Sequence, residues 1–196
     1  MRTLRGTKIV ESGCLDADLN IFYSLSDDGR KYVLRQPRKG DAGKQRKAWK
    51  QLSDRSKERY VRANIEEQWL YTVNQRCRRP LYRGEVPGVL PLTVEVDGEV
   101  VGFCDGFFRY GVDFSRYEVG ETDLCGNFSL GVLDKFQGMG IGTYYSTLTH
   151  HISRHFGCKW ELGQTYIKGG LYHIRMRDGW EVVSKTKDFV VFKVLL

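Results

Sequence analysis

The stretch Gln137-Gly138-Met139-Gly140-Ile141-Gly142 decides the fold that we predict for this chain of 196 residues. It follows residues 127–133, whose alternating pattern is typical of a buried strand, and it precedes residues 140–156, where apolar side chains recur at helical spacing. A turn that opens a helix leaves several backbone N–H groups without intrahelical partners, at the positive end of the helix dipole. Because glycines lack the Cβ atoms that would keep a phosphate away, we predict that this turn holds an anionic group, above all a pyrophosphate.

Two common phosphate-binding motifs do not describe this turn. A Walker A loop carries a lysine directly after its last glycine, whereas Thr143 follows Gly142 here. A dinucleotide fingerprint has the spacing G-x-G-x-x-G, but the third glycine of this chain comes one place early. Glu161 lies at a suitable distance for a ribose-binding acid, yet too few residues follow the motif for the usual doubly wound domain.

The turn resembles the acyl-CoA turn of the GNAT acetyltransferase superfamily, whose pattern is Q/R-x-x-G-x-G/A. Gln137, Gly140 and Gly142 match that pattern at every fixed position. The resemblance implies an α/β fold with α+β layers: a mixed, mostly antiparallel sheet of six or seven strands, helices on both faces, and a splayed central pair of strands. It also implies an acyl-CoA-dependent N-acyltransferase, with acetyl-CoA as the default cosubstrate, no metal, and direct attack by the amine of an acceptor.

The order of the predicted elements extends the resemblance to roughly residues 30–196. After the turn we expect a helix, a strand, a second helix and a glycine–aromatic step into a further strand, at residues 140–156, 159–163, 168–178 and 179–183. Before it we expect a strand at 31–35, helical structure over 40–75, a loop over 80–91, and strands 92–97 and 100–109. The last two are joined by Asp97-Gly98, a strong two-residue hairpin turn.

The first thirty residues are expected to form an N-terminal extension. Residues 20–25 are predicted to pair with residues 32–35 as a hairpin arm, through a turn at residues 26–29. Residues 31–196 are then interpreted as one GNAT-like acyltransferase domain, a length that is ordinary for a single core.

Composition argues against a membrane protein and against a secreted one. No apolar run approaches the roughly 20 residues of a membrane span, and the N-terminus lacks the apolar stretch of a signal peptide. The five cysteines are odd in number and scattered, which favours a reduced, cytoplasmic compartment. His151 and His155 have a spacing that suits a shared metal, but no third ligand has suitable local spacing, so no metal site is predicted.

The formal net charge of +7 is unevenly distributed. Residues 30–62 carry 13 Lys/Arg and 3 Asp/Glu, whereas residues 92–131 carry 2 Lys/Arg and 8 Asp/Glu. The basic surface, which further arginines extend over residues 30–83, has two interpretations: a solvated face of two helices, or a surface that meets nucleic acid. The expected partner is an amine-bearing acceptor, which is a small molecule, a protein or a nucleic acid.

The resemblance assigns cofactor contacts to the strand before the turn and to the turn itself. The strand's backbone would pair with the pantetheine arm, and the turn would hold the pyrophosphate. The residues concerned are Leu130, Val132, Gln137, Gly138, Met139, Gly140, Ile141, Gly142 and Thr143. The thioester carbonyl would lie near a backbone donor that stabilises an oxyanion.

Catalytic residues are less well defined, because the chain departs from the family pattern. The tyrosine that protonates the leaving thiolate in the family corresponds to Arg175, so Tyr172, almost one helical turn earlier, is the candidate acid, with His173 as an alternative. Candidates for taking the amine proton, or for placing the water that does so, are Asp123, Asn127 and Ser129, with Glu121 and Asp105 as further carboxylates. Two other functions therefore stay open: a nucleic-acid-modifying acyltransferase-like enzyme, and a non-catalytic CoA-fold binding module.

Overall fold

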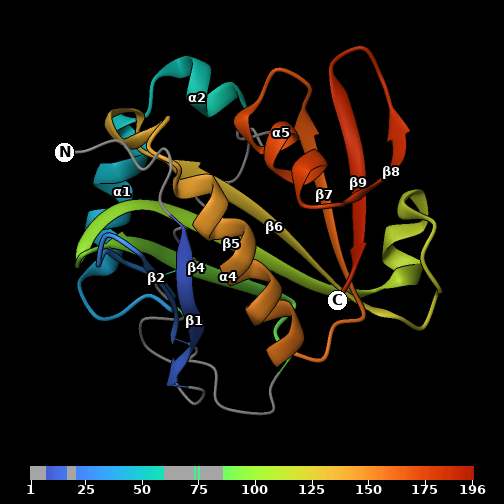
Figure 1. Ribbon diagram of the computed structural model, residues 1–196, viewed down its shortest axis with the longest axis horizontal. Coiled ribbons are helices and arrows are strands. Elements are labelled where there is room, and N and C mark those ends of the chain that lie inside the picture. Colours follow the sequence, from blue (N-terminus) through green and yellow to red (C-terminus); the bar gives the residue numbers. More distant parts are fainter. Residues whose placement is uncertain (1–7, 17–20, 60–72, 74, 76–85) are drawn as a thin grey trace.

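A nine-stranded sheet forms the centre of the molecule, in a computed structural model that describes residues 8–16, 21–59, 73, 75 and 86–196 (Figure 1). The strand order is β1-β2-β3-β4-β5-β6-β7-β9-β8. The strands are β1 (Ile9–Asp16), β2 (Ile21–Ser26), β3 (Lys31–Arg35), β4 (Val89–Val96), β5 (Glu99–Tyr110), β6 (Leu124–Val132), β7 (Trp160–Tyr166), β8 (Glu181–Lys185) and β9 (Phe189–Leu195). The helices are α1 (Asp41–Gln51), α2 (Asp54–Arg59), α4 (Ile141–His155), α5 (Gly170–Arg177) and the short 3₁₀ helices η1 (Gly111–Tyr117) and η2 (Asp134–Phe136).

The sheet is mixed and mostly antiparallel, as predicted, but it is wider than expected. The predicted hairpin is present, with Ile21 of β2 opposite Arg35 and Leu25 opposite Lys31 of β3. Strand β1 then pairs with the other edge of β2, so the first thirty residues contribute two strands to the same sheet. This contribution explains why the described residues form nine strands where six or seven were predicted. The domain division at residue 30 stays a prediction.

Strands β6 and β7 form a splayed pair. They are parallel and are paired only from Cys125 opposite Trp160 to Asn127 opposite Leu162. Beyond that point β6 stays paired with β5, and β7 with β9, so the two strands separate. Within the described part of the chain, residues 128–132 of β6 thus have a backbone edge that faces no strand.

Helices cover both faces of the sheet. A Cβ atom on Gly126 would lie 2.7 Å from the Ser153 hydroxyl of α4. A Cβ atom on Gly131 would instead lie 2.5 Å from the Phe103 ring. That ring packs against Trp49 of α1, with the ring centroids 5.7 Å apart. Because Gly126 and Gly131 point to opposite faces of β6, α4 and α1 lie on opposite sides. Figure 1 shows α4 crossing its face diagonally.

Helix α4 is amphipathic, and its apolar side packs on the sheet. Its buried apolar residues recur at helical spacing: Ile141, Tyr144, Tyr145, Leu148 and Ile152. The Tyr144 ring stacks on Tyr32 of β3, with centroids 3.6 Å apart. The predicted helix 140–156 is therefore confirmed, and its packing fixes where its N-terminus lies.

The predicted loop over residues 80–91 is wrong at its end, since Pro91 lies in β4 opposite Asp105. Strand β3 reaches only Thr93, so one edge of β4 faces no described strand at Pro91, where the missing N–H group of proline is tolerated. The predicted helical stretch 40–75 contains α1 and α2, and its residues 60–72 and 74 lie outside the described part.

A buried ion pair attaches the first turn of α1 to the sheet. The Arg35 guanidinium of β3 donates to Asp41 at 2.6 Å and to Glu95 at 2.5 Å, and its side chain is only 5% exposed. Asp41 also accepts the Arg38 N–H group at 2.6 Å. Burial by itself would raise the pKa of Asp41, but the hydrogen bonds from Arg35 and Arg38 outweigh burial and lower it.

We predict that Arg35→Met destabilises the protein by about 3–5 kcal/mol, because it leaves the buried Asp41 carboxylate without its cation. The pKa of Asp41 is lower in the folded protein than in the unfolded chain. Ionised Asp41 therefore contributes its full share to the free energy of unfolding above the unfolded-state pKa, which is near 4, and this share is lost as the pH falls through the folded-state pKa. Urea denaturation at several pH values measures both effects. The exposed Arg46→Met on α1 is the control and should change stability by less than about 0.5 kcal/mol; equal losses in the two variants would contradict the prediction.

Candidate functional site

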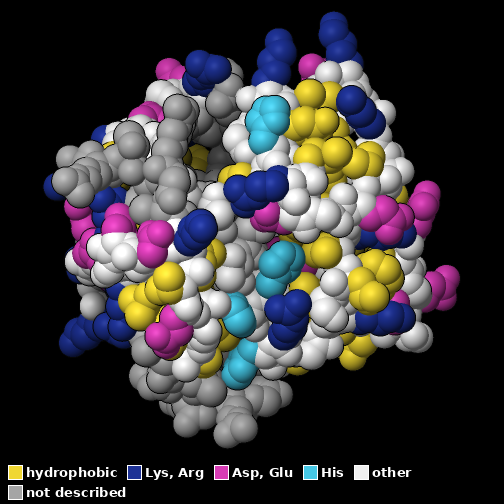
Figure 2. All heavy atoms as spheres, viewed as in Figure 1, with side chains coloured by type: hydrophobic (Ala, Val, Ile, Leu, Met, Phe, Trp, Pro, Cys, Tyr) yellow, Lys and Arg dark blue, Asp and Glu magenta, His cyan; other side chains and the backbone are white. Residues whose placement is uncertain are grey.

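A cavity of about 430 Å³ opens between α2, α5, the end of β6 and the turn before α4. Figure 2 shows the molecule hollowed between α2 and α5. The walls of the cavity are mostly apolar side chains and glycine backbone. They include seven of the predicted contact residues: Leu130, Val132, Gln137, Gly138, Gly140, Ile141 and Gly142. Met139 and Thr143 belong to the same turn but do not line the cavity.

The turn has a backbone that requires glycine. Gly138 has a φ of 76° and Gly140 a φ of 86°, both in the left-handed region that other residues enter only at a cost. Gly140 caps α4 without a side-chain hydrogen bond, and α4 has no acidic residue in its first turn. The N–H groups at the start of α4 thus have no side-chain acceptor at the cap and lie at a positive helix end beside the cavity.

The Gln137 side chain fixes the turn through hydrogen bonds to neighbouring segments. Its Nε2 lies 3.0 Å from the Val132 carbonyl, 2.9 Å from Asp134 and 3.1 Å from the Ser56 hydroxyl. Asp134 also accepts the Ser56 hydroxyl at 2.6 Å and the Ser53 N–H group at 2.7 Å. These hydrogen bonds, that from Ser56 first, lower the pKa of Asp134. The network ties the turn to the end of β6 and to the start of α2, which are two walls of the cavity.

The third glycine of the motif has a packing role. A Cβ atom on Gly142 would lie 2.9 Å from Ile174 Cδ1 and 3.5 Å from Leu171 Cδ2, both on α5. Any larger residue would therefore displace the Ile174 side chain. Leu171 and Ile174 in turn line the cavity, so this contact sets the position of one wall.

Two of the predicted catalytic residues are engaged away from the cavity. Tyr172 is half-buried and packs on the cluster of Trp180, Val190 and Phe192, with its ring 6.1 Å from Phe192. Asp123 accepts hydrogen bonds from Lys159 and Trp160, each at 2.9 Å, and these contacts, Lys159 first, lower its pKa.

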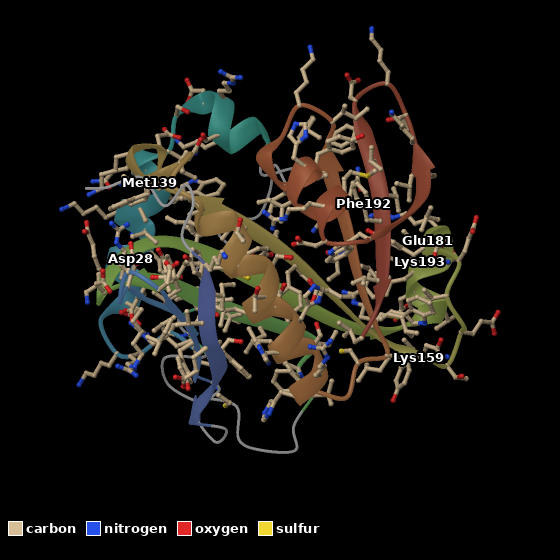
Figure 3. The ribbon with its side chains drawn as sticks, in the orientation of Figure 1. Asp28, Met139, Lys159, Glu181, Phe192 and Lys193 are labelled. Carbon is tan, nitrogen blue, oxygen red and sulfur yellow. The ribbon has the colours of Figure 1, made fainter. Side chains whose placement is uncertain are left out.

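Asp123 also lies far from the turn. It immediately precedes β6, whereas the turn follows the other end of that strand. Figure 3 labels Lys159, the partner of Asp123, at the opposite end of the splayed pair from Met139 of the turn.

The other two predicted catalytic residues lie on the strand that borders the splay. Asn127 Nδ2 donates to the Leu162 carbonyl at 3.1 Å, across the point where β6 and β7 separate, and to the Tyr117 hydroxyl at 3.3 Å. Ser129 pairs with Asp105 of β5, whose side chain is 2% exposed. Asp105, Asn127 and Ser129 share one sheet face by strand alternation. Tyr117 was not singled out in the sequence, because η1 brings it to this place through tertiary packing alone.

No group of three or more His, Cys, Asp or Glu side chains is arranged for a metal among the residues that the structure describes. His151 instead forms a 2.7 Å hydrogen bond with Ser12 of β1, and burial lowers the pKa of its imidazole. Cys104, Cys125 and Cys158 are buried free thiols. Of the described helices, none has the length and apolar character to span a bilayer.

The chain was compared with known protein families, curated proteins and solved structures. Residues 48–165, more than half of the chain, match the acetyltransferase (GNAT) family. No curated protein matches in sequence. The fold is similar to that of the GNAT domain of PAT from S. lividans, at 16% identity and a TM-score of 0.61 over 86% of this chain and 93% of that one.

Two further structures with the same fold were solved with CoA species. The RimJ protein of Mycobacterium smegmatis, in complex with CoA-disulfide, is 13% identical with a TM-score of 0.59, over 100% of this chain and 90% of that one. The yncA protein of Salmonella typhimurium, a putative acetyltransferase with its cofactor acetyl-CoA, is 17% identical with a TM-score of 0.52, over 84% and 94%.

Because the backbone of the turn is left-handed, we predict that replacing its glycine lowers the stability of the protein. Gly140→Ala should destabilise the protein by about 1–2 kcal/mol, because alanine must adopt the same positive φ. The matched control is Gly43→Ala in α1, an exposed helical glycine, which should stabilise by about 0.5–1 kcal/mol. Denaturant titrations of both variants measure the difference, and a gain in stability at residue 140 would show that its backbone is not strained.

Proposed function

Because the chain belongs to the acetyltransferase (GNAT) family, we propose that it transfers an acyl group, acetyl by default, from acyl-CoA to an amine. Membership of this family makes the chain an acyltransferase. The observation that carries the proposal is one of geometry. The glycine turn with its helix N-terminus and the strand-free edge of β6 border the same cavity, and so offer an anion site next to a line of backbone hydrogen-bonding groups.

The cavity fits the chemistry of acyl-CoA. Its volume lies in the range of small-molecule sites, and its apolar walls suit an extended, weakly polar arm. We assign the diphosphate to the turn from Gln137 to Thr143, where the absence of an acidic residue in the first turn of α4 leaves the helix dipole unopposed. We assign the amides of the pantetheine arm to the free edge of β6 around Leu130 and Val132.

The reaction follows from this placement. The amine nitrogen attacks the thioester carbonyl carbon, the new C–N bond forms, the C–S bond breaks, and the electron pair of that bond goes to sulfur. The amine proton goes to a base or to water. We propose that the acceptor approaches over the face that carries Asp105, Asn127 and Ser129, which lies opposite α4. A cytoplasmic location, expected from the cysteine pattern, is part of the same proposal.

Acetyl-CoA should raise the melting temperature of the purified protein. At a hundredfold excess over Kd the stabilisation is about 2.7 kcal/mol, or roughly 5–10 °C for a chain of this size. Gly140→Glu should abolish the shift, because its carboxylate would stand at the N-terminus of α4 beside the diphosphate.

The matched control for this experiment is Gly157→Glu. Gly157 also has a positive φ, of 75°, and open space around it, but it follows the far end of α4. This variant should lose a similar amount of stability and keep the shift. A shift that is absent in the native protein, or equal in the two variants, would count against the proposed function.

A second candidate, an acceptor carried on nucleic acid, is favoured by the charge of the α1 surface. Seven basic side chains are exposed on and around α1: Arg38, Lys39, Lys44, Arg46, Lys47, Lys50 and Arg55. Helix α2, which follows directly, borders the cavity through Ser56. A polyanion on this surface would therefore lie at the edge of the cavity.

Charge reversal separates the two candidates. If the acceptor is a nucleic acid, the quadruple variant K44E/R46E/K47E/K50E should lose salt-sensitive retention on RNA or DNA, with the salt slope falling by about 0.7–0.9 for each phosphate contact removed. The control K168E/R177E/K185E/K187E reverses four exposed charges near α5 and β8, and should keep retention. A metabolite acceptor would be favoured if both variants were retained equally on nucleic acid and if the protein released CoA with small amines but not with nucleic acid.

A further inference from the structure

The Arg175 side chain packs against β7 at the level where β6 and β7 separate. Arg175 is on α5 and is only 4% exposed. Its guanidinium lies against Gly163 of β7, since a Cβ atom on Gly163 would stand 2.3 Å from the guanidinium carbon. Gly163 is the first residue of β7 beyond the last pair, Asn127 opposite Leu162. A charged group thus lies over the α4 face of β7, at the level where β6 and β7 separate, and a glycine makes room for it.

The guanidinium of Arg175 has a buried N–H group without an acceptor among the described residues. Its faces are covered by the rings of Trp180 at 4.7 Å and Phe192 at 5.8 Å. Nη1 is buried and has no hydrogen-bond partner among the described residues. A buried donor that lacks an acceptor is costly, so an acceptor on a ligand that reached Nη1 would be stabilised there.

The charged and titratable groups that face Arg175 compensate its charge in part but accept no hydrogen bond from Nη1. Burial lowers the pKa of Arg175, and Tyr145 of α4, Glu161 of β7 and Tyr117 of η1 oppose that effect. Glu161 is the one carboxylate among them, and its oxygens are held by α4: Thr149 donates to one at 2.8 Å, Ser153 to the other at 3.2 Å, and His150 Nδ1 lies 3.2 Å from the latter. Burial raises the pKa of Tyr145 well above its usual value, so its phenol stays neutral. An arginine remains protonated throughout the usable pH range.

We propose that Arg175 binds the sulfur of coenzyme A as a thiolate, and so stabilises the leaving group by charge instead of by protonation. The inference rests on the proposed function, because it needs the pantetheine arm to follow β6. The cavity is lined by Gly131 of β6 and by Ile174, the residue before Arg175. From Gly131 to Asn127 the strand rises about 13 Å, so an arm on that edge leads from the cavity to the guanidinium.

The transfer step balances without an acid. When the C–S bond breaks, the electron pair stays on sulfur, and the resulting thiolate pairs with the guanidinium. The proton that the amine loses goes to the base or to water and is not needed by sulfur. A guanidinium suits this role because it carries a permanent charge and directs several N–H donors, but cannot itself give up a proton near neutral pH.

The test is a pH titration of bound CoA, followed by the ultraviolet absorbance of its thiolate. The complex with desulfo-CoA, which lacks the sulfur, supplies the background from the protein's own thiols. We expect the pKa of the bound thiol to lie at least one unit below that of free CoA in the same buffer. This experiment requires no knowledge of the acceptor.

Two arginine variants on the same helix complete the test. Arg175→Met should return the bound thiol to the pKa of free CoA. It should also remove the preference for CoA over desulfo-CoA, which reaches about tenfold for each unit of pKa shift at a pH above the pKa of the free thiol. Arg177→Met is the matched control, because Arg177 is exposed and bonds to Asp178 at 2.8 Å; it should keep both properties. If Arg175→Met fails to fold, the native titration decides, with Arg175→Lys expected to keep part of the shift.

The outcomes separate the two proposals. An unshifted thiol pKa in the native complex, or an unchanged shift in Arg175→Met, overturns the role of Arg175 while leaving CoA binding intact. Failure of both CoA and desulfo-CoA to stabilise the native protein removes the proposed function, and this inference with it.

Discussion

The separation of β6 from β7 is the constraint on which the rest of the site depends. Three residue pairs join the strands, and the Asn127 amide then bridges to the Leu162 carbonyl at 3.1 Å. Beyond that bridge, β5 holds the outer edge of β6 and β9 holds the outer edge of β7. Neither strand is able to turn toward the other without losing a complete ladder of hydrogen bonds. The backbone between them therefore stays available to a ligand, and every other feature of the site is placed relative to this opening.

Positive charge lies at both ends of the path that this opening defines. At the outer end, the N-terminus of α4 offers backbone N–H groups, which carry partial positive charges that do not change with pH. At the inner end, Arg175 offers a full charge that is shielded from water. A cosubstrate with a permanent anion at one end and a developing anion at the other matches this arrangement. The apolar walls between the ends, such as Leu130 and Ile174, strengthen both interactions because they exclude water.

The local features of this fold could be predicted from the sequence, and the long-range ones could not. Helix α4 and the Asp97-Gly98 hairpin are specified by nearby residues, through helical spacing and through a turn in which both residues adopt positive φ. By contrast, the burial of Arg175 depends on Gly163, and the position of Tyr117 depends on the packing of η1. Charged side chains are usually exposed, so sequence patterns give no sign of a buried one. Tyr172 illustrates the same limit, since Phe192, on a strand beyond it, decides which way its ring packs.

Helix α5 approaches its neighbours at two glycines. Gly142 admits Ile174 against α4, and Gly163 admits Arg175 against β7. At each contact a single methyl group would overlap with atoms of α5. Two missing Cβ atoms thus leave space for side chains of α5, one against α4 and one against β7, and the first of these side chains lines the cavity. A substitution at Gly142 would displace the Ile174 side chain in the apolar wall, whereas one at Gly163 would displace the Arg175 guanidinium itself.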